Sequence, residues 1–221
     1  MIKVENIEVW GFRHAIRGMR NPLASWHKSD SVYLSHQYCD EDKEVEMMQY
    51  CDKVPAIGKN DLDLMRRLYV AGTEHRKFLR QIFVSMDITC PVYLAAELDT
   101  YKVGTVRNSC SFMHKGVAKP FEIEDFSTHM DGDVDVVWWK VIDALNILRD
   151  YYLKSKDPEI FNQIRCLLPS GYNQRFTYTM NYENVVTMIH QRENHRLPEW
   201  RTFTDILKSL PYVKEIMGVD E

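Results

Sequence analysis

The sequence predicts an α+β fold, a single domain in which a small β-sheet is packed by helices. Strand-like alternation and helical three-to-four spacing both occur along the chain, without the regular strand–helix succession of a parallel α/β sheet. The 221 residues, 45% of them hydrophobic, are enough to build one large core. No internal repeat, low-complexity tract or clear boundary divides the chain. We therefore expect one domain over residues 1–221, with a loop-rich insertion at 21–59.

The first elements follow from local periodicity. Lys3–Trp10 alternates as a strand does, and Arg13–Met19 is compatible with a short helix. Asn21–Lys59 shows no sustained period and contains Pro22 and the acidic run Asp40–Asp42. We expect this stretch to be a long loop or a hairpin insertion, and long loops in compact domains are often functional.

A helix is expected after this loop. Asn60 is a candidate N-cap with Asp63 at the N3 position, and Gly72 is a candidate helix end. The inward-facing residues of this helix are expected to be Leu64, Met65 and Leu68. Thr73–Arg80 then has the composition of a second, charged helical turn.

The middle of the chain predicts a strand, a helix and a polar segment. The strand is indicated by alternating apolar residues at Ile82, Val84, Met86 and Ile88. Pro91 stops this strand and stands near the start of a helix over Val92–Asp99. Lys102–Gly116 is polar and irregular, which is typical of a solvated connection and equally compatible with a ligand-binding loop.

The last third contains further helices and a strand. Asp133 is a candidate cap for a long amphipathic helix with an apolar stripe at Val134, Val137, Trp138, Val141, Leu145, Leu148 and Tyr152. Arg175 opens an alternating run in which Phe176, Tyr178 and Met180 share one face of a strand. Asn181 is the candidate N-cap of the next helix, and Pro198 begins a final helix with Trp200, Phe203, Leu207 and Leu210 on one face.

Two arginines fall where the local pattern predicts a half-buried surface. Arg192 shares the apolar stripe of Val185, Met188 and Ile189, and Arg175 begins the preceding strand. A guanidinium on an apolar face is costly unless it meets an anion. A structural pair with a carboxylate is one interpretation for either residue. Because both arginines flank one strand–helix junction, the other interpretation is a pocket for a phosphate or carboxylate ligand.

Composition restricts the class of protein. The net charge of −4 and the pI of about 6.1 argue against non-specific nucleic-acid binding. The sequence shows neither the apolar core of a signal peptide nor a run long enough to span a membrane. Five cysteines without a CxxC motif favour a reducing, cytoplasmic context with free thiols.

The C-terminal third resembles the signature of flavin-dependent thymidylate synthases. In that family a Leu-Pro pair is followed by a Tyr and an Arg that lead into a short strand. An Asn, a helix that ends in Arg, a His and a Trp come next. The matching residues are Leu168, Pro169, Tyr172, Arg175, Asn181, Arg192, His195 and Trp200. The resemblance extends back to about Leu62.

The middle of the chain departs from the same family. The family motif RHRxxSxNExSxRY corresponds to Thr100–His114, where Thr100, Tyr101 and Lys102 replace Arg-His-Arg and Thr105 keeps a hydroxyl. Cys110 falls at the second Ser, and Phe112-Met113 replaces the closing Arg-Tyr. A flavin-contacting His of the family falls at Gln81, and a nucleotide-holding Gln falls at Glu97. Lys102 keeps one charge but lacks the bidentate fork of arginine.

The resemblance implies a ligand site with altered chemistry. It assigns a pyrimidine nucleotide to Arg175, Arg192, Lys102, Thr105, Glu97 and Cys110. It assigns FAD to Gln81, Tyr101, Asn181 and His195. Since most of the family's cations are replaced, we expect flavin binding to be weakened, altered or absent and ordinary thymidylate synthesis to be lost. An active flavin-dependent enzyme on a pyrimidine nucleotide and a structural oligomer with a vestigial pocket remain the alternatives. The family also implies a homo-oligomer, most simply a tetramer.

Other candidate sites are weaker. His36, Cys39 and Cys51 have metal-ligating side chains but not the spacing of a zinc site, and we expect no metal. His129–Asp133 is better explained as an Asp-Gly turn before a helix cap. Cys110 has the chemistry of a nucleophile, although a buried free thiol is the simpler interpretation.

Overall fold

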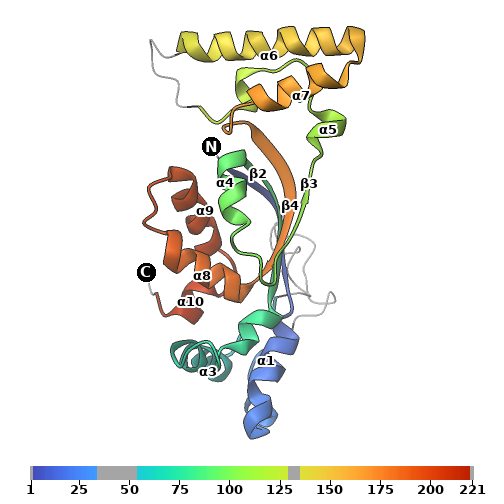
Figure 1. Ribbon diagram of the computed structural model, residues 1–221. Helices are drawn as coiled ribbons and strands as arrows, with labels where there is room; N and C mark the ends of the chain where they lie inside the picture. The colour runs from blue at the N-terminus through green and yellow to red at the C-terminus, as the bar shows by residue number, and fades with distance from the viewer. Residues whose placement is uncertain (1, 34–53, 129–134, 220–221) are drawn as a thin grey trace, which may run out of the picture. The chain divides into compact units, whose positions relative to one another are not determined.

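The computed structural model describes residues 2–33, 54–128 and 135–219, and it confirms the α+β fold (Figure 1). Four strands form one sheet in the order β1-β2-β4-β3. Their bounds are β1 Lys3–Trp10, β2 Phe83–Pro91, β3 Val106–Ser109 and β4 Asn173–Asn181. The two central strands are antiparallel, because the Val92 amide donates to Tyr172 O at one end and the Tyr182 amide to Ile82 O at the other, both at 2.9 Å.

The central strands form where the sequence alternates. In β2 the buried side chains are Val84, Met86 and Ile88, and in β4 they are Phe176, Tyr178 and Met180. Each set lies on one face of its strand because successive side chains point to opposite faces. These predictions are confirmed.

The chain divides into two compact units. The first comprises residues 1–4, 88–100 and 108–177, and the second comprises residues 5–87, 101–107 and 178–221. The helices of the first unit are α4 Val92–Leu98, α5 Phe112–Lys115, the 3₁₀ turn Ile123–Asp125, α6 Asp135–Ser155 and α7 Pro158–Leu167. Helices α6 and α7 lie side by side (Figure 1). Their inner faces help to bury a core of Phe121, Phe126, Ile142, Leu145 and Ile164.

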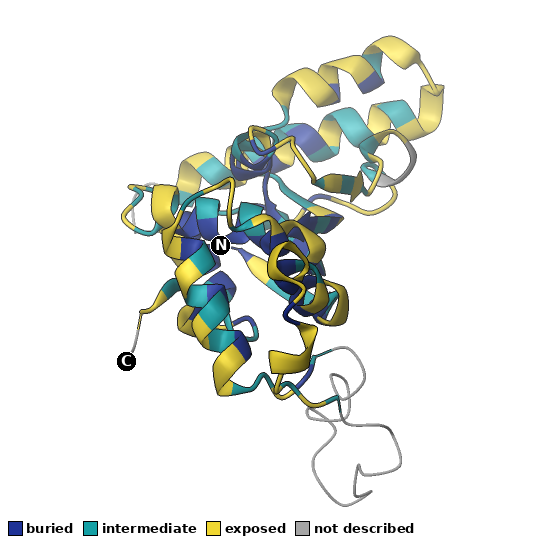
Figure 2. Ribbon diagram, turned by 90° about the horizontal axis from the view of Figure 1, so that it is seen from below, coloured by how far each residue is buried: buried dark blue, intermediate teal, exposed yellow. Residues whose placement is uncertain are grey.

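The second unit has more helices. They are α1 Phe12–Arg20, the 3₁₀ turns Asn21–Leu23, Trp26–Lys28 and Lys77–Gln81, α3 Lys59–Val70, α8 Tyr182–Arg192, α9 Pro198–Lys208 and α10 Val213–Met217. Helix α10 packs on α3, and α9 packs on α8. Phe12, Tyr182, Trp200 and Phe203 are among its fully buried side chains. Figure 2 shows buried residues on the inner faces of the helices and exposed residues on the outer faces.

Helix α3 begins earlier than expected. Gly58, not Asn60, is its N-cap, and the amides of Asn60 and Asp61 are capped by the carboxylate of Asp30, which is distant in sequence. Of the expected inward face, Met65 is fully buried but Leu64 and Leu68 are only half-buried. The end of the helix was predicted correctly: Gly72 follows it with a φ of 104°.

Four further elements were not predicted. Strand β3 and helix α5 lie within Lys102–Gly116, which was expected to be irregular. Helix α7 was missed, although Asp157 is its N-cap and accepts from the Glu159 amide at 2.9 Å. Helix α10 follows the helix that was expected to be final.

Two expectations are settled only in part. Val137 belongs to the expected stripe of α6, but it is 59% exposed, whereas Leu145 on the same helix is fully buried. Asp133 and Val134 lie outside the described residues. The expected insertion begins with two 3₁₀ turns, and an isolated bridge joins Val32 to Ala56.

Candidate functional site

Tyr101 contacts Gln191, Arg192 and Trp200 in a polar and aromatic cluster of the second unit. It is buried at the start of the segment 101–107, and its hydroxyl donates to Gln191 Oε1 at 2.9 Å. The same hydroxyl accepts from Arg192 Nε at 3.0 Å. The Tyr101 ring also meets Trp200 edge-on, with the ring centroids 6.0 Å apart. Tyr101 therefore fixes the position of the last turn of α8.

Arg192 contacts Tyr101 and Trp200 in this cluster. Besides the Tyr101 hydroxyl, its guanidinium carbon lies 4.9 Å from the centroid of Trp200 and 5.8 Å from that of Tyr101. A guanidinium over aromatic faces is attracted electrostatically by the rings. The half-buried position predicted for Arg192 is confirmed. The side chain is thus oriented before any ligand arrives, which lowers the entropic cost of binding an anion.

Asn181 acts at the start of α8 and against the segment 101–107. Its Oδ1 accepts from the Asn184 amide at 3.1 Å, which confirms the predicted N-cap. The Asn184 side chain in turn donates to Val103 O at 2.9 Å. Gly104 has a φ of 76°, and a Cβ at this position would lie 2.5 Å from Asn181 Nδ2. A glycine is therefore required for this close approach.

His195 and Thr105 stabilise the edges of the same cluster. The His195 ring meets Trp200 at a centroid distance of 6.2 Å, and its Nδ1 accepts from the Leu197 amide at 3.3 Å. Thr105 Oγ1 donates to Tyr101 O at 2.6 Å. The second unit thus brings together five of the residues that the sequence singled out: Tyr101, Thr105, Asn181, Arg192 and His195.

A cavity in the first unit contains two others, Cys110 and Arg175. Its volume is about 220 Å³, and its wall is formed by Val92, Cys110, Ser111, Phe112, Gly116, Leu168, Tyr172, Asn173, Gln174 and Arg175. The Cys110 amide donates to Arg175 O at 2.9 Å, which places the two residues on neighbouring strand ends. This volume is below the 300 Å³ or so of a typical small-molecule pocket, so it suits a single ring better than a whole cofactor.

Two expectations about this cavity are wrong. Cys110 was expected to be buried, but its side chain is exposed, because β3 is a short edge strand. Arg175 was expected to be half-buried but is exposed, since it points away from the face that Phe176 buries. Both side chains are therefore accessible to a ligand.

Tyr172 supplies a protonated hydroxyl to the cavity wall. Burial raises the pKa of Tyr172, and the negative charge of Asp125 raises it further, while Lys119 opposes the shift. The phenol therefore stays neutral at physiological pH and can donate a hydrogen bond.

The remaining predicted residues lie apart from these two groups of contacts. Lys102 is exposed at the start of the segment 101–107. Glu97 is half-buried on α4, where its carbonyl accepts from the Thr100 amide and hydroxyl at 3.1 and 2.7 Å. Gln81 is exposed and lies against α1, where its Oε1 would be 2.5 Å from a Cβ added to Gly18. Since Arg175 and Arg192 belong to different units, their shared pocket stays a prediction.

Metal and membrane signals add nothing to this site. Among the described residues, no group of three or more His, Cys, Asp or Glu side chains could hold a metal ion. The described residues do not include the candidate ligands His36, Cys39 and Cys51 or the stretch His129–Asp133. No helix in the described part of the chain has the length and apolarity needed to cross a membrane.

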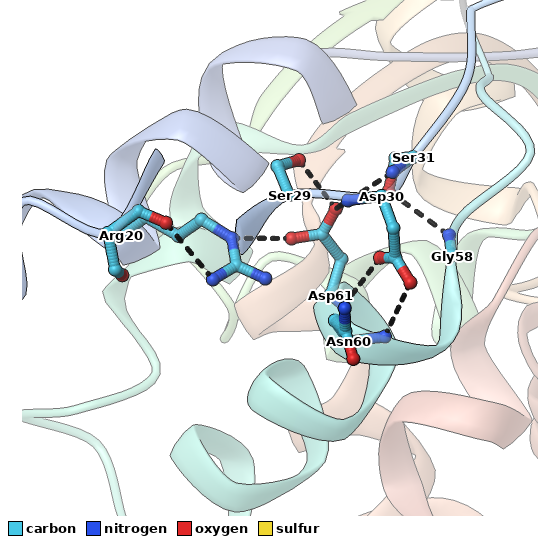
Figure 3. A network of polar contacts seen from close by, with 8 residues as sticks. Arg20, Ser29, Asp30, Ser31, Gly58, Asn60 and Asp61 are labelled. Carbon is cyan, nitrogen blue, oxygen red and sulfur yellow. Dashed lines mark hydrogen bonds and ion pairs between the residues drawn. The ribbon is translucent and has the colours of Figure 1, made fainter. Parts of the chain in front are cut away.

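One buried ion pair was missed by the sequence analysis. Arg20 Nε lies 2.6 Å from Asp61 Oδ1, and both side chains are almost completely buried (Figure 3). The signal was available, because Arg20 follows Phe12 and Ile16 on the apolar face of α1 at helical spacing. An arginine on an apolar stripe indicates an anionic partner for Arg20 as it does for Arg192.

The strand order and the covering helices define an α+β fold for which solved structures exist. No family model and no curated protein matches the sequence. A crystal structure of thymidylate synthase X (ThyX) from Helicobacter pylori with FAD and dUMP matches with a TM-score of 0.65 and 15% identity, over 98% of this chain and 97% of that one. A further structure of flavin-dependent thymidylate synthase ThyX from Helicobacter pylori, complexed with FAD and dUMP, matches with a TM-score of 0.67 and 16% identity, over 97% of each chain. The fold that the resemblance predicted is therefore confirmed.

Proposed function

We propose that this protein is a divergent relative of the flavin-dependent thymidylate synthases that binds a pyrimidine nucleotide and does not carry out ordinary thymidylate synthesis. The likeness to structures that hold FAD and dUMP supports the ligand class. One observation carries the proposal: Tyr101, which stands where the resemblance places a family His, holds Arg192 by a 3.0 Å hydrogen bond. The site has kept an oriented arginine while it has exchanged the residues around it.

Arg175 and Arg192 are the proposed anchors for the nucleotide. Charge-assisted hydrogen bonds are the strongest that a protein makes to a phosphate, and arginine matches phosphate geometry with two parallel donors. The cavity beside Arg175 is of a size for a pyrimidine ring, with the Tyr172 hydroxyl as a donor in its wall. Lys102, Thr105, Glu97 and Cys110 are the further nucleotide-binding candidates.

FAD is the candidate cofactor, because both neighbours hold it, and when bound it would supply hydride transfer. The residues assigned to it fit it poorly. Asn181 Oδ1 is used as a helix cap, and His195 Nδ1 accepts from the backbone. Gln81 and Tyr101 carry no positive charge, whereas a pyrophosphate needs several cations or donors. We therefore expect weak FAD binding or none.

The assembly and compartment are part of the same proposal. We propose a homo-oligomer, most simply a tetramer, in the cytoplasm, on the basis of the family resemblance and of free rather than paired thiols. Among the described cysteines, Cys90, Cys110 and Cys166 form no disulfide. No nucleic-acid or membrane partner is proposed.

Nucleotide binding is tested by titration calorimetry of the purified protein with dUMP. Arg175→Ala and Arg192→Ala are each expected to weaken binding by about 1.5–3 kcal/mol, which is roughly tenfold to over a hundredfold. Arg165→Ala, an exposed arginine of α7 outside both groups of contacts, removes the same charge and is the matched control. A wild-type protein that binds no pyrimidine nucleotide would leave the structural oligomer with a vestigial pocket.

Catalysis is tested separately. The visible absorption spectrum of the purified protein reports bound flavin. A yellow protein that also rescues a thymidine-requiring bacterium without its own synthase would show that the active flavin-dependent enzyme, not the proposal, is correct.

A further inference from the structure

The hydrogen bonds at the Tyr101 hydroxyl run in one direction, from Arg192 through Tyr101 to Gln191. A phenol has one proton to donate, and its oxygen can accept. The proton goes to Gln191 Oε1 at 2.9 Å, and the oxygen accepts from Arg192 Nε at 3.0 Å. Because arginine is only a donor, the hydroxyl can meet it only as an acceptor. An acceptor for the phenol proton, which Gln191 supplies, therefore favours the contact with Arg192.

The side-chain amide of Gln191 suits this arrangement in one orientation. With Oε1 toward Tyr101, each donor in the series meets an acceptor. With Nε2 in that place, two donors would point at one hydroxyl oxygen, and the phenol proton would lose its acceptor on Gln191. Hydrogen bonds in series also polarise one another. The acceptor on Gln191 therefore strengthens the bond that holds Arg192.

The helix places Gln191 and Arg192 on two sides of the same hydroxyl. The two residues are consecutive in the last turn of α8, and consecutive side chains leave a helix about 100° apart. Tyr101 is buried, and its ring is fixed by the edge-on contact with Trp200, whereas Gln191 is exposed. Gln191 therefore contributes a hydrogen bond rather than core packing, and its substitution should leave the fold intact.

The contact with Tyr101 also determines how Arg192 can meet an anion. A guanidinium binds a phosphate bidentately through two parallel N–H groups. Because Nε donates to Tyr101, a bidentate contact with a phosphate would use the two Nη nitrogens. The Trp200 ring, 4.9 Å from the guanidinium carbon, adds a second contact that restricts the side chain. A guanidinium oriented before binding loses less entropy when the ligand arrives.

We propose that Gln191 is a positioning residue of the nucleotide site. By accepting the Tyr101 proton, it holds the hydroxyl as an acceptor for Arg192 and keeps the Nη edge of the guanidinium for the phosphate of the ligand. The inference rests on the proposed nucleotide binding, because Arg192 is one of its anchors. The series of hydrogen bonds is nevertheless present without a ligand, so it can be tested separately.

The first test is calorimetric titration with dUMP of the wild type, Gln191→Met, Tyr101→Phe and the double variant. Methionine has a similar length without the amide oxygen, and phenylalanine keeps the ring without the hydroxyl. Each single variant should weaken binding by about twofold to tenfold, the effect of one hydrogen bond. If Gln191 acts through Tyr101, the double variant should bind no more weakly than Tyr101→Phe. Gln163→Met replaces an exposed glutamine of α7 in the first unit; it is the matched control and should bind as the wild type does.

The second test needs no ligand. The Nε proton of Arg192 gives an NMR signal that is identified by its loss in Arg192→Lys, and its exchange with solvent reports the hydrogen bond to Tyr101. Exchange should be about twofold to tenfold faster in Gln191→Met. It should stay slow in Gln191→Glu, which keeps an acceptor.

The two measurements separate this inference from the proposed function. A wild type that binds no dUMP refutes nucleotide binding, and the exchange of the Arg192 proton then decides the role of Gln191. The same measurement decides if circular dichroism shows that Tyr101→Phe does not fold. Unchanged exchange in Gln191→Met, equal dUMP affinity of Gln191→Met and its control, or losses that add in the double variant would each overturn the inference.

Discussion

Replacing Asp61 by asparagine should destabilise the protein severely. The Asp61 side chain is fully buried, and its partner Arg20 is 4% exposed. Asp61→Asn leaves the guanidinium as a buried charge without its counterion. Removing one member of a buried ion pair typically costs about 3–5 kcal/mol. For a chain of this size each kcal/mol lowers the melting temperature by about 2–4 °C, so a fall of roughly 6–20 °C is expected.

Asp63→Asn is the matched control for this experiment. Asp63 lies two residues away on the same helix, but it is exposed, so its substitution should change the free energy of unfolding by no more than about 0.5 kcal/mol. Thermal and urea unfolding, followed by circular dichroism, would compare both variants with the wild type. A loss below about 1 kcal/mol in Asp61→Asn would show that water or a shifted side chain readily replaces the carboxylate, and the reasoning would be wrong.

The stability difference should also depend on pH. Burial alone would raise the pKa of Asp61, but hydrogen bonds from Ser31, Ser29 and Arg20 and the guanidinium charge outweigh burial and lower the pKa in the folded state. The ionised form of Asp61 therefore stabilises the protein fully above the unfolded pKa of about 3.9. This contribution is lost as the pH falls from that value through the folded pKa. Asp61→Asn has no such group. The difference between wild type and variant should therefore be constant from about pH 5 to 7 and shrink below about pH 4.

Three further predictions follow from the fold. Gly104→Ala should destabilise the protein more than Gly72→Ala does in thermal unfolding. Both glycines have positive φ, but of the two only Gly104 has a close neighbour, Asn181 Nδ2. Equal losses of about 1–2 kcal/mol would mean that Asn181 moves aside at little cost. Spectroscopic titration should show a tyrosine that ionises above about pH 10 in the folded protein and is absent from Tyr172→Phe. Because the folded pKa of Tyr172 is raised, its stabilising contribution is present below the unfolded pKa and is lost as the pH rises through the folded pKa. An unchanged titration curve in the variant would contradict this prediction. Light scattering should show an oligomer at micromolar concentration, and a monomer throughout would count against a site shared between subunits.

The elements predicted correctly are those whose pattern is local. The alternation of Val84, Met86 and Ile88 sufficed for β2, because a strand that buries one face must alternate. The start of α3 could not be predicted, since its cap is the carboxylate of Asp30, which only the fold brings to Asn60. Strand β3 was equally inaccessible, because it has a polar sequence and exists through its pairing with β4.

The candidate site was predicted in its residues but not in its contacts. Tyr101, Asn181 and Arg192 were singled out by the family resemblance, and the second unit brings them into one cluster. The hydrogen bond between Tyr101 and Arg192 could not be predicted, because the two residues are distant in the chain and only the packing of the segment 101–107 on α8 joins them. The exposure of Cys110 was missed for a similar reason, since it depends on the position of β3 at the edge of the sheet.

Arg20 and Arg192 show how one sequence pattern produces two kinds of site. Each arginine lies on the apolar stripe of a helix, in its last turn. Arg20 meets the ionised carboxylate of Asp61, so its charge is balanced and its loss would act mainly on stability. The contacts that orient Arg192 include a hydroxyl and two aromatic rings, which attract the guanidinium electrostatically. Arg20 is 4% exposed whereas Arg192 is only half-buried, so a ligand from solvent reaches Arg192 more readily, and for this reason nucleotide binding is proposed for Arg192.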